Sequence, residues 1–273
     1  MSTSTSAGRY SDIISRLRAA GCVFAEDEAR LLVSSARTTD ELADMVARRV
    51  EGLPLEHVLG WAEFLGLRIA VEPGVFVPRR RTEFLVREAA ALLDPSAEDT
   101  SAPAVVVDLC CGSGAVGAGV AAIVGRVELH AVDIDPVAVR CAGGNLAAYG
   151  GQVYQGDLYQ PLPDGIRGRV DLLVVNAPYV PTEAVRLLPP EARVHEPSVA
   201  LDGGPDGQDV QRRVAAESRH WLAPGGHLVI ETSERQAPTT VEAFARGGLV
   251  PRVAHAEELG ATAVIGVKPD TRH

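Results

Sequence analysis

The sequence predicts an α/β protein built on a doubly wound, mainly parallel sheet, preceded by a smaller helical region. From about residue 105 onward, short apolar runs rich in β-branched residues alternate with helical segments. The runs are residues 105–107, 127–132, 153–154, 172–175, 227–230, 250–253 and 263–267. Uninterrupted apolar strands joined by helices are typical of a parallel sheet covered on both faces, with ligand sites at the carboxyl ends of its strands.

The first part of the chain has the apolar spacing of amphipathic helices. Ile13 and Leu17 share one helical face, and similar spacing recurs until Gly52 and Pro54, which are typical helix-ending residues. We therefore expect a helical N-terminal domain over residues 1–60.

A β-hairpin connector is expected next, over residues 61–84, where short β-type runs are separated by glycine-containing turns. Thr82 is placed to cap the helix that follows. The α/β domain then extends over residues 85–273, with a loop rich in Ser, Ala, Asp and Pro at residues 95–103.

The composition limits the possible functions before any motif is considered. The 273 residues include 36 acidic and 26 basic side chains, a net charge of −10. Such a surface repels phosphate backbones, so nucleic acid is disfavoured as the main partner. No stretch approaches the roughly 18 apolar residues of a membrane span, and we expect a cytoplasmic protein without membrane contact. The four cysteines lack CxxC spacing, so we expect no metal and no disulfide framework.

A glycine-rich turn follows the first strand of the α/β region. Gly112, Gly114 and Gly117 form a GxGxxG pattern, in which glycines permit a tight turn and close approach of the backbone to a ligand. Asp133 lies 19 residues after Gly114, near the spacing expected for a carboxylate that binds ribose hydroxyls. The alternative role for Asp133 is to cap the following helix.

A nicotinamide dinucleotide and S-adenosylmethionine share this geometry, and the acid that ends the first strand helps to separate them. Asp108 would repel a pyrophosphate, whereas it suits the ammonium group of S-adenosylmethionine. Asp157, next to Gly156, can accept a hydrogen bond from an adenine amine, unless it is only a turn or cap residue. These acids favour S-adenosylmethionine as the cofactor.

The strand at residues 172–175 leads directly into the tetrad Asn176, Ala177, Pro178 and Tyr179. An amide nitrogen is a poor nucleophile, because its lone pair is delocalised into the carbonyl. The Asn176 side-chain oxygen and the Ala177 carbonyl, both accepting from an amide NH₂ group, would orient that nitrogen with its lone pair toward a methyl group. Pro178 biases Ala177 to an extended conformation, and Tyr179 can stack on a flat amide or base.

With these motifs the chain resembles the HemK/PrmC family of class I S-adenosylmethionine-dependent methyltransferases, which N5-methylate a glutamine side chain in a protein. Ordered matches cover nearly the whole chain. They lie at residues 28–32, 54–60, 64–66, 77–79, 82–83, 108–114, 133, 156–157, 176–179, 196–197, 201–209, 224–226, 231 and 236. The resemblance implies a Rossmann-like doubly wound sheet with an antiparallel C-terminal strand, and an N-terminal helical domain that helps to grip the substrate.

The resemblance also implies roles for individual residues. The implied cofactor-binding set lies at the carboxyl ends of strands and consists of Asp108, Cys110, Gly112, Gly114, Asp133, Ile134, Asp157, Leu158 and Asn176. The implied catalytic set is Asn176, Ala177, Pro178 and Tyr179, and the implied substrate contacts are Asn176, Ala177, Tyr179 and Arg79. The implied partner is a class I peptide chain release factor, through the glutamine of its Gly-Gly-Gln loop, or a ribosomal protein. We expect a monomer that binds no nucleic acid stably.

The chain departs from the family pattern beside the site. Ala177 stands where proline is usual, and Arg80 and Arg81 stand where proline and an acid are common. With Arg79 they form a basic run that either contacts an acidic part of the substrate or is a solvated surface. The remaining alternatives are the same reaction on another protein, N6-adenine methylation of nucleic acid, a nicotinamide-binding module, and a binding protein that keeps the cofactor pocket without turnover.

Overall fold

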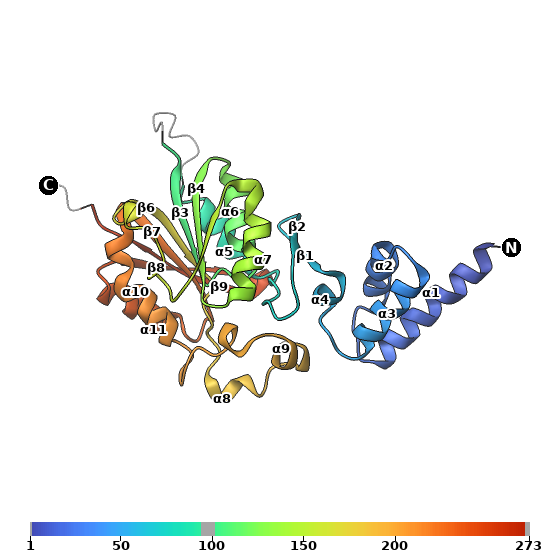
Figure 1. Cartoon of the computed structure of the whole chain (residues 1–273). Coiled ribbons are helices and arrows are strands. Elements are labelled where there is room, and N and C mark those ends of the chain that lie inside the picture. Colours follow the sequence, from blue (N-terminus) through green and yellow to red (C-terminus); the bar gives the residue numbers. More distant parts are fainter. Residues whose placement is uncertain (1, 94–101, 271–273) are drawn as a thin grey trace.

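The computed structural model describes residues 2–93 and 102–270, with side chains from residue 8 onward. An α/β body and an N-terminal group of helices lie beside one another, joined by a β-hairpin (Figure 1). The loop expected at residues 95–103 lies mostly outside the described residues.

The body is built on a seven-stranded sheet with the order β5-β4-β3-β6-β7-β9-β8. Its strands are β3 (Ala104–Leu109), β4 (Val127–Asp133), β5 (Gln152–Gln155), β6 (Val170–Val175), β7 (Leu222–Thr232), β8 (Val250–Ala256) and β9 (Ala261–Val267). Strands β3 to β7 pair in parallel, whereas β9 runs antiparallel to both β7 and β8. The predicted doubly wound sheet with an antiparallel C-terminal strand is therefore confirmed. Its strand order reverses between β3 and β6, which is where such sheets bind ligands.

Side-chain alternation along the strands builds a separate core on each face of the sheet. Val107 of β3 belongs to the core that includes Phe244, whereas Val106 belongs to the core that includes Leu85 and Leu172. The helices are α5 (Thr82–Ala90), α6 (Ala115–Val124) and α7 (Pro136–Leu146) on one face, and α10 (Asp209–Trp221) and α11 (Ala237–Arg246) on the other (Figure 1). Short 3₁₀ turns are η1 (Ala147–Tyr149), η2 (Asp164–Ile166), η3 (Ser198–Ala200) and η4 (Glu257–Leu259).

The N-terminal helices enclose a small core of their own. They are α1 (Ser2–Ala19), α2 (Ala25–Ser35), α3 (Thr39–Val50) and α4 (Leu55–Leu59). Leu17, Leu32 and Val46 are fully buried between them. The same group buries an ion pair, in which Arg49 Nε lies 2.6 Å from Glu28 Oε2. Burial of this pair ties α3 to α2.

Within the connector, β1 (Trp61–Phe64) pairs with β2 (Leu67–Ala70) in an antiparallel hairpin. Asn145 of α7 anchors it to the body: its Oδ1 accepts from Ala70 N at 2.9 Å, and its Nδ2 donates to the carbonyls of Ala70 and Ser113 at 2.9 and 2.8 Å. Because Ser113 belongs to the glycine-rich turn, the hairpin and that turn are held together.

The predicted helix cap at Thr82 is wrong. Thr82 does not cap α5: it is the first residue of the helix, Arg81 occupies the cap position, and no side chain makes a cap hydrogen bond there. Two short helices, α8 (Thr182–Val185) and α9 (Pro190–His195), lie between β6 and β7 and have no counterpart among the expected elements. Each of these short helices begins at or just after a proline and is too short for apolar periodicity, so the sequence pattern does not predict them.

Candidate active site

A cavity of about 520 Å³ lies at the carboxyl ends of the central strands. Its walls are the segments that follow β3, β4, β5 and β6, together with the connector, the N-terminus of α5 and the segment around α9. Every residue predicted for the site lines this cavity except Asp108 and Gly114. The strand ends thus bring together residues that are far apart in sequence.

The glycine-rich turn is held by Asp133 at the end of β4. Asp133 Oδ2 accepts from Gly112 N at 2.8 Å, and Oδ1 accepts from Asp135 N at 2.9 Å. Burial raises the pKa of the Asp133 carboxyl. Gly114 has a φ of 76°, and a Cβ there would lie 3.1 Å from a Leu146 side-chain atom, so the turn requires glycine. The helix after Asp133 is capped by Asp135, whose Oδ1 accepts from Val137 N at 2.8 Å.

Asp108 supports the turn from behind the cavity wall. It is buried, and its Oδ2 accepts from Gly117 N at 2.8 Å. A Cβ on Gly117 would lie 3.1 Å from the same oxygen, so the third glycine of GxGxxG allows α6 to approach the carboxylate. Burial raises the pKa of Asp108 to about 7. Its other oxygen, Oδ1, is buried without a hydrogen-bond partner.

The wall after β5 presents Asp157 and Leu158. Asp157 Oδ2 accepts from Arg213 Nη2 of α10 at 2.6 Å, and Arg213 also lines the cavity. Cys110 and Leu158 both have positive φ, 57° and 51°, where side chains other than glycine are uncommon. Burial raises the pKa of the Cys110 thiol, so it is not a nucleophile at neutral pH.

The tetrad after β6 forms the wall opposite the glycine-rich turn. Asn176 is half-buried, and its Nδ2 donates to Thr82 Oγ1 at 3.5 Å. Ala177 is buried, and Pro178 also faces the cavity. The hydroxyl of Tyr179 donates to Glu231 Oε1 at 3.3 Å and accepts from Arg81 Nη2 at 2.5 Å. Burial, together with Glu231, raises the pKa of Tyr179 to about 12.

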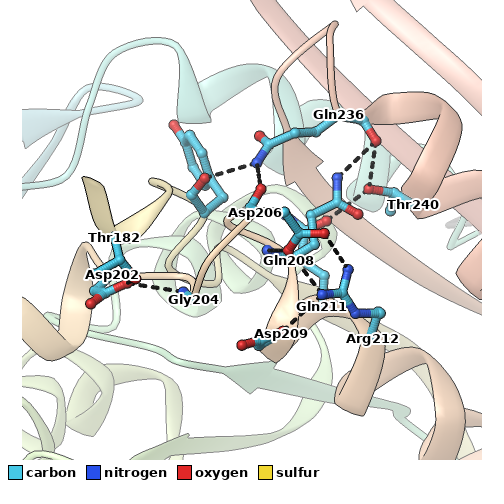
Figure 2. Close-up of polar contacts among 11 residues, drawn as sticks. Thr182, Asp202, Gly204, Asp206, Gln208, Asp209, Gln211, Arg212, Gln236 and Thr240 are labelled. Carbon is cyan, nitrogen blue, oxygen red and sulfur yellow. Dashed lines mark hydrogen bonds and ion pairs between the residues drawn. The ribbon is translucent and has the colours of Figure 1, made fainter. Parts of the chain in front are cut away.

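A glycine-rich segment at residues 202–209 packs closely against the backbone of the tetrad. Figure 2 shows the polar contacts around this segment. Gln236 Nε2 donates to the carbonyls of Tyr179 and Asp206, at 3.0 and 3.1 Å. A Cβ on Gly207 would lie 2.4 Å from the Tyr179 carbonyl oxygen. Glycine at this position and the amide of Gln236 therefore hold the backbone that carries the tetrad.

Arg79 reaches the cavity from the connector. Its Nη2 lies 2.5 Å from Glu196 Oε1, and the Glu196 side chain is fully buried. Glu196 Oε1 also accepts from Val77 N at 3.3 Å. Burial raises the pKa of Glu196, against the lowering effect of Arg79. Of the other two arginines, Arg81 contacts Tyr179, and Arg80 is exposed.

Sequence reasoning missed partners that only the fold brings to the site, namely Arg81, Thr82, Glu196, Arg213 and Glu231. Thr82, Glu196 and Glu231 belong to the matched motifs, which was the available signal for them. Arg213 had no local signal, since it lies on a helix far from the tetrad in sequence.

The strand order, the antiparallel β9 and a cavity built on a glycine-rich turn define the class I methyltransferases. The model of the Methyltransferase small domain family matches residues 66–202. Release factor glutamine methyltransferase of Geobacter sulfurreducens is 37% identical, over 81% of this chain and 75% of that protein. That of Mycolicibacterium smegmatis is 38% identical, over 81% and 78%. The chain belongs to the release factor glutamine methyltransferase family, which confirms the resemblance to HemK/PrmC.

Solved structures agree on the fold. A methyltransferase from Pyrococcus furiosus superposes with a TM-score of 0.53 at 15% identity, covering 75% of this chain and 90% of that one. At this identity the likeness concerns the fold alone.

Proposed function

We propose that this chain transfers a methyl group from S-adenosylmethionine to the side-chain nitrogen of a glutamine in the Gly-Gly-Gln loop of a class I release factor. The observation that carries the proposal is that Asn176, Ala177 and Tyr179 line the same cavity as Gly112 and Asp133. An acceptor amide and a methyl donor then meet in one cavity. The names of the curated relatives support the choice of a release factor.

When bound, the cofactor supplies a methyl group on a positively charged sulfur. Asn176 Oδ1 and the Ala177 carbonyl accept from the two N–H bonds of the target amide and leave its lone pair directed at the methyl carbon. A carbon–nitrogen bond forms as the carbon–sulfur bond breaks, and the sulfur keeps the electron pair. The nitrogen then loses one proton to water, so His195 and the other titratable groups need not act as a base.

The cofactor-binding roles are part of the same proposal. Asp133 binds the ribose hydroxyls, and Asp157 with Leu158 receives the adenine. Cys110, Gly112 and Ile134 line the space between them. Asp108 and Gly114 act from behind the wall, Asp108 through Gly117 N and Gly114 through its backbone conformation.

The expected partner is a protein. In residues 2–93 and 102–270, no helix is long and apolar enough to cross a membrane. The net charge of −10 favours a basic protein partner over nucleic acid. We propose that the enzyme works as a cytoplasmic monomer, with the N-terminal helices contacting the substrate, and that Arg79 meets the substrate at the cavity.

The test is methyl transfer from labelled S-adenosylmethionine to a purified class I release factor. We expect the factor to be labelled, and we expect no labelling of a variant factor in which the Gly-Gly-Gln glutamine is replaced by alanine. Asn176→Ala should abolish labelling while S-adenosylhomocysteine still binds. Labelling of a ribosomal protein or of DNA in place of the factor would overturn the release-factor assignment, and label on both factors would overturn the target residue.

A further inference from the structure

Thr82 lies between the side chain of Asn176 and the carboxylate of Glu231. Its hydroxyl oxygen accepts from Asn176 Nδ2 at 3.5 Å, and the Thr82 residue is buried. Glu231 lies on its other side: the Thr82 hydroxyl lowers the pKa that burial raises, and Glu231 Oε2 is buried with no hydrogen-bond partner among the described residues. Asn176, Thr82 and Glu231 thus form a chain of polar contacts that leads away from the cavity.

Sheet register explains why these residues meet. Val175 of β6 pairs with Ile230 of β7, so Asn176 and Glu231 follow at adjacent positions on the same sheet edge. Thr82 begins α5, whose residues pack on this part of the sheet in the same core as Leu172 and Val229. The contact depends on the crossing of three elements and on no local motif.

The carboxylate of Glu231 is itself fixed. Its Oε1 accepts from the Tyr179 hydroxyl at 3.3 Å and from Arg81 Nε at 3.4 Å. Glu231 is 3% exposed, so water does not compete for it. These two contacts hold the carboxylate in place and favour its charged form.

The direction of the hydrogen bonds follows from donor and acceptor chemistry. A carboxylate can only accept, and Glu231 Oε2 has no other donor among the described residues, so the Thr82 hydroxyl proton is directed toward Glu231. With its proton used in this way, the hydroxyl oxygen can only accept, and it accepts a hydrogen bond from an N–H group of Asn176. That choice turns Asn176 Nδ2 toward Thr82 and leaves Oδ1 to face the cavity.

The orientation matters because the two ends of an Asn side chain have opposite hydrogen-bonding character. If Asn176 Nδ2 faced the target amide, its N–H groups would oppose the N–H groups of that amide. The lone pair of the target nitrogen would then be drawn to Asn176 instead of the methyl group. We propose that Thr82 and Glu231 are positioning residues that set which end of Asn176 meets the methyl acceptor. This inference rests on the proposed methylation of glutamine.

The experiment compares Thr82→Val, which removes the hydroxyl at nearly constant shape, with Thr82→Ser, which keeps it. With the release factor as substrate, Thr82→Val should lower kcat by about tenfold or more while KM changes less than about twofold. Thr82→Ser should stay within about threefold of wild type. The Kd for S-adenosylhomocysteine should be unchanged in both variants, which would show that the cofactor site is intact. The thermal midpoint should be unchanged in Thr82→Ser.

Glu231→Gln provides an independent test. The amide of a glutamine can donate a hydrogen bond to the Thr82 hydroxyl and so reverse the direction of the hydrogen bonds from Glu231 to Asn176. This substitution should lower kcat, and adding Thr82→Val to it should cause little further loss, since both changes act through one hydroxyl. Equal activity of Thr82→Val and wild type, or equal loss in Thr82→Val and Thr82→Ser, would overturn the inference. Failure of the wild-type enzyme to methylate the glutamine would instead overturn the proposed function, and the inference with it.

Discussion

Arg49 and Glu191 form an ion pair, with 2.6 Å between Nη1 and Oε1, that joins α3 of the N-terminal group to α9 of the body. Glu191 lines the cavity, whereas Arg49 is buried and also pairs with Glu28. The N-terminal helices are therefore attached to the segment that closes one side of the site. Under the proposed function, this ion pair links the helices expected to contact the substrate to one wall of the cavity.

The two ion pairs of Arg49 should differ in their effect on stability. Arg49→Met leaves Glu28 buried without a partner, and we expect it to lower the free energy of unfolding by about 3–5 kcal/mol. Glu191→Gln removes the more exposed partner and should cost less than about 1 kcal/mol. Urea unfolding of both variants checks this, and comparable losses would contradict the difference in burial.

Gly207→Ala should damage the site without removing any functional group. The new Cβ would lie 2.4 Å from the Tyr179 carbonyl oxygen, at a φ of 79°, so the backbone of the tetrad must shift. We expect kcat for release-factor methylation to fall by roughly tenfold or more. The matched control is Gly144→Ala in α7, where a Cβ meets nothing within 4 Å. It should raise stability by about 0.5–1 kcal/mol and leave kcat unchanged.

Asp108 should make stability depend on pH. Because burial raises its pKa to about 7 from 3.8, the folded chain stays protonated there while the unfolded chain ionises. The stabilising effect of the neutral carboxyl is full below about pH 4 and is lost as the pH rises through about 7. Asp108→Asn removes the titration of this carboxyl. Between about pH 4 and pH 7, the free energy of unfolding of the wild type should therefore fall by up to about 4 kcal/mol relative to that of the variant. Parallel pH curves for the two proteins would contradict the raised pKa.

Restoring proline at position 177 should improve the site. A proline ring limits φ and reduces the entropy of the unfolded chain, which favours a fixed carbonyl beside the cofactor. We expect Ala177→Pro to raise kcat and to add about 0.4–1 kcal/mol of stability, and Ala177→Gly to have the opposite effects. Kinetics and thermal unfolding of the three proteins decide, and a lower kcat in Ala177→Pro would mean that the buried site rejects the larger ring.

The parts of the site that could be predicted are contiguous in sequence. The GxGxxG turn and the tetrad each carry their own geometry, because glycine and proline restrict the backbone locally. Asp133 followed from its spacing, since a strand and a helix have defined lengths. Thr82 could not be placed in this way: the hydroxyl that looked like a helix cap contacts Asn176, 94 positions away.

The same contrast holds for the charged groups. Arg79, Arg80 and Arg81 look alike in sequence, yet the structure gives them different partners: Arg79 meets Glu196, and Arg81 meets Glu231, 150 positions away. Nothing in a run of arginines indicates which of them reaches a buried carboxylate. Their partners depend on how the connector crosses the edge of the sheet.

Local chemistry in the amino-acid sequence was enough for the fold class, the family and most of the residues that the structure brings to the cavity. Apolar periodicity specifies strands and helices, and the motifs fall at strand ends because turns follow strands. The pairing of β6 with β7, by contrast, places Asn176 beside Glu231 and gives the tetrad its supporting contacts. Those contacts are hydrogen bonds and ion pairs between segments distant in the chain, and they exist only once burial has brought the segments together and excluded water.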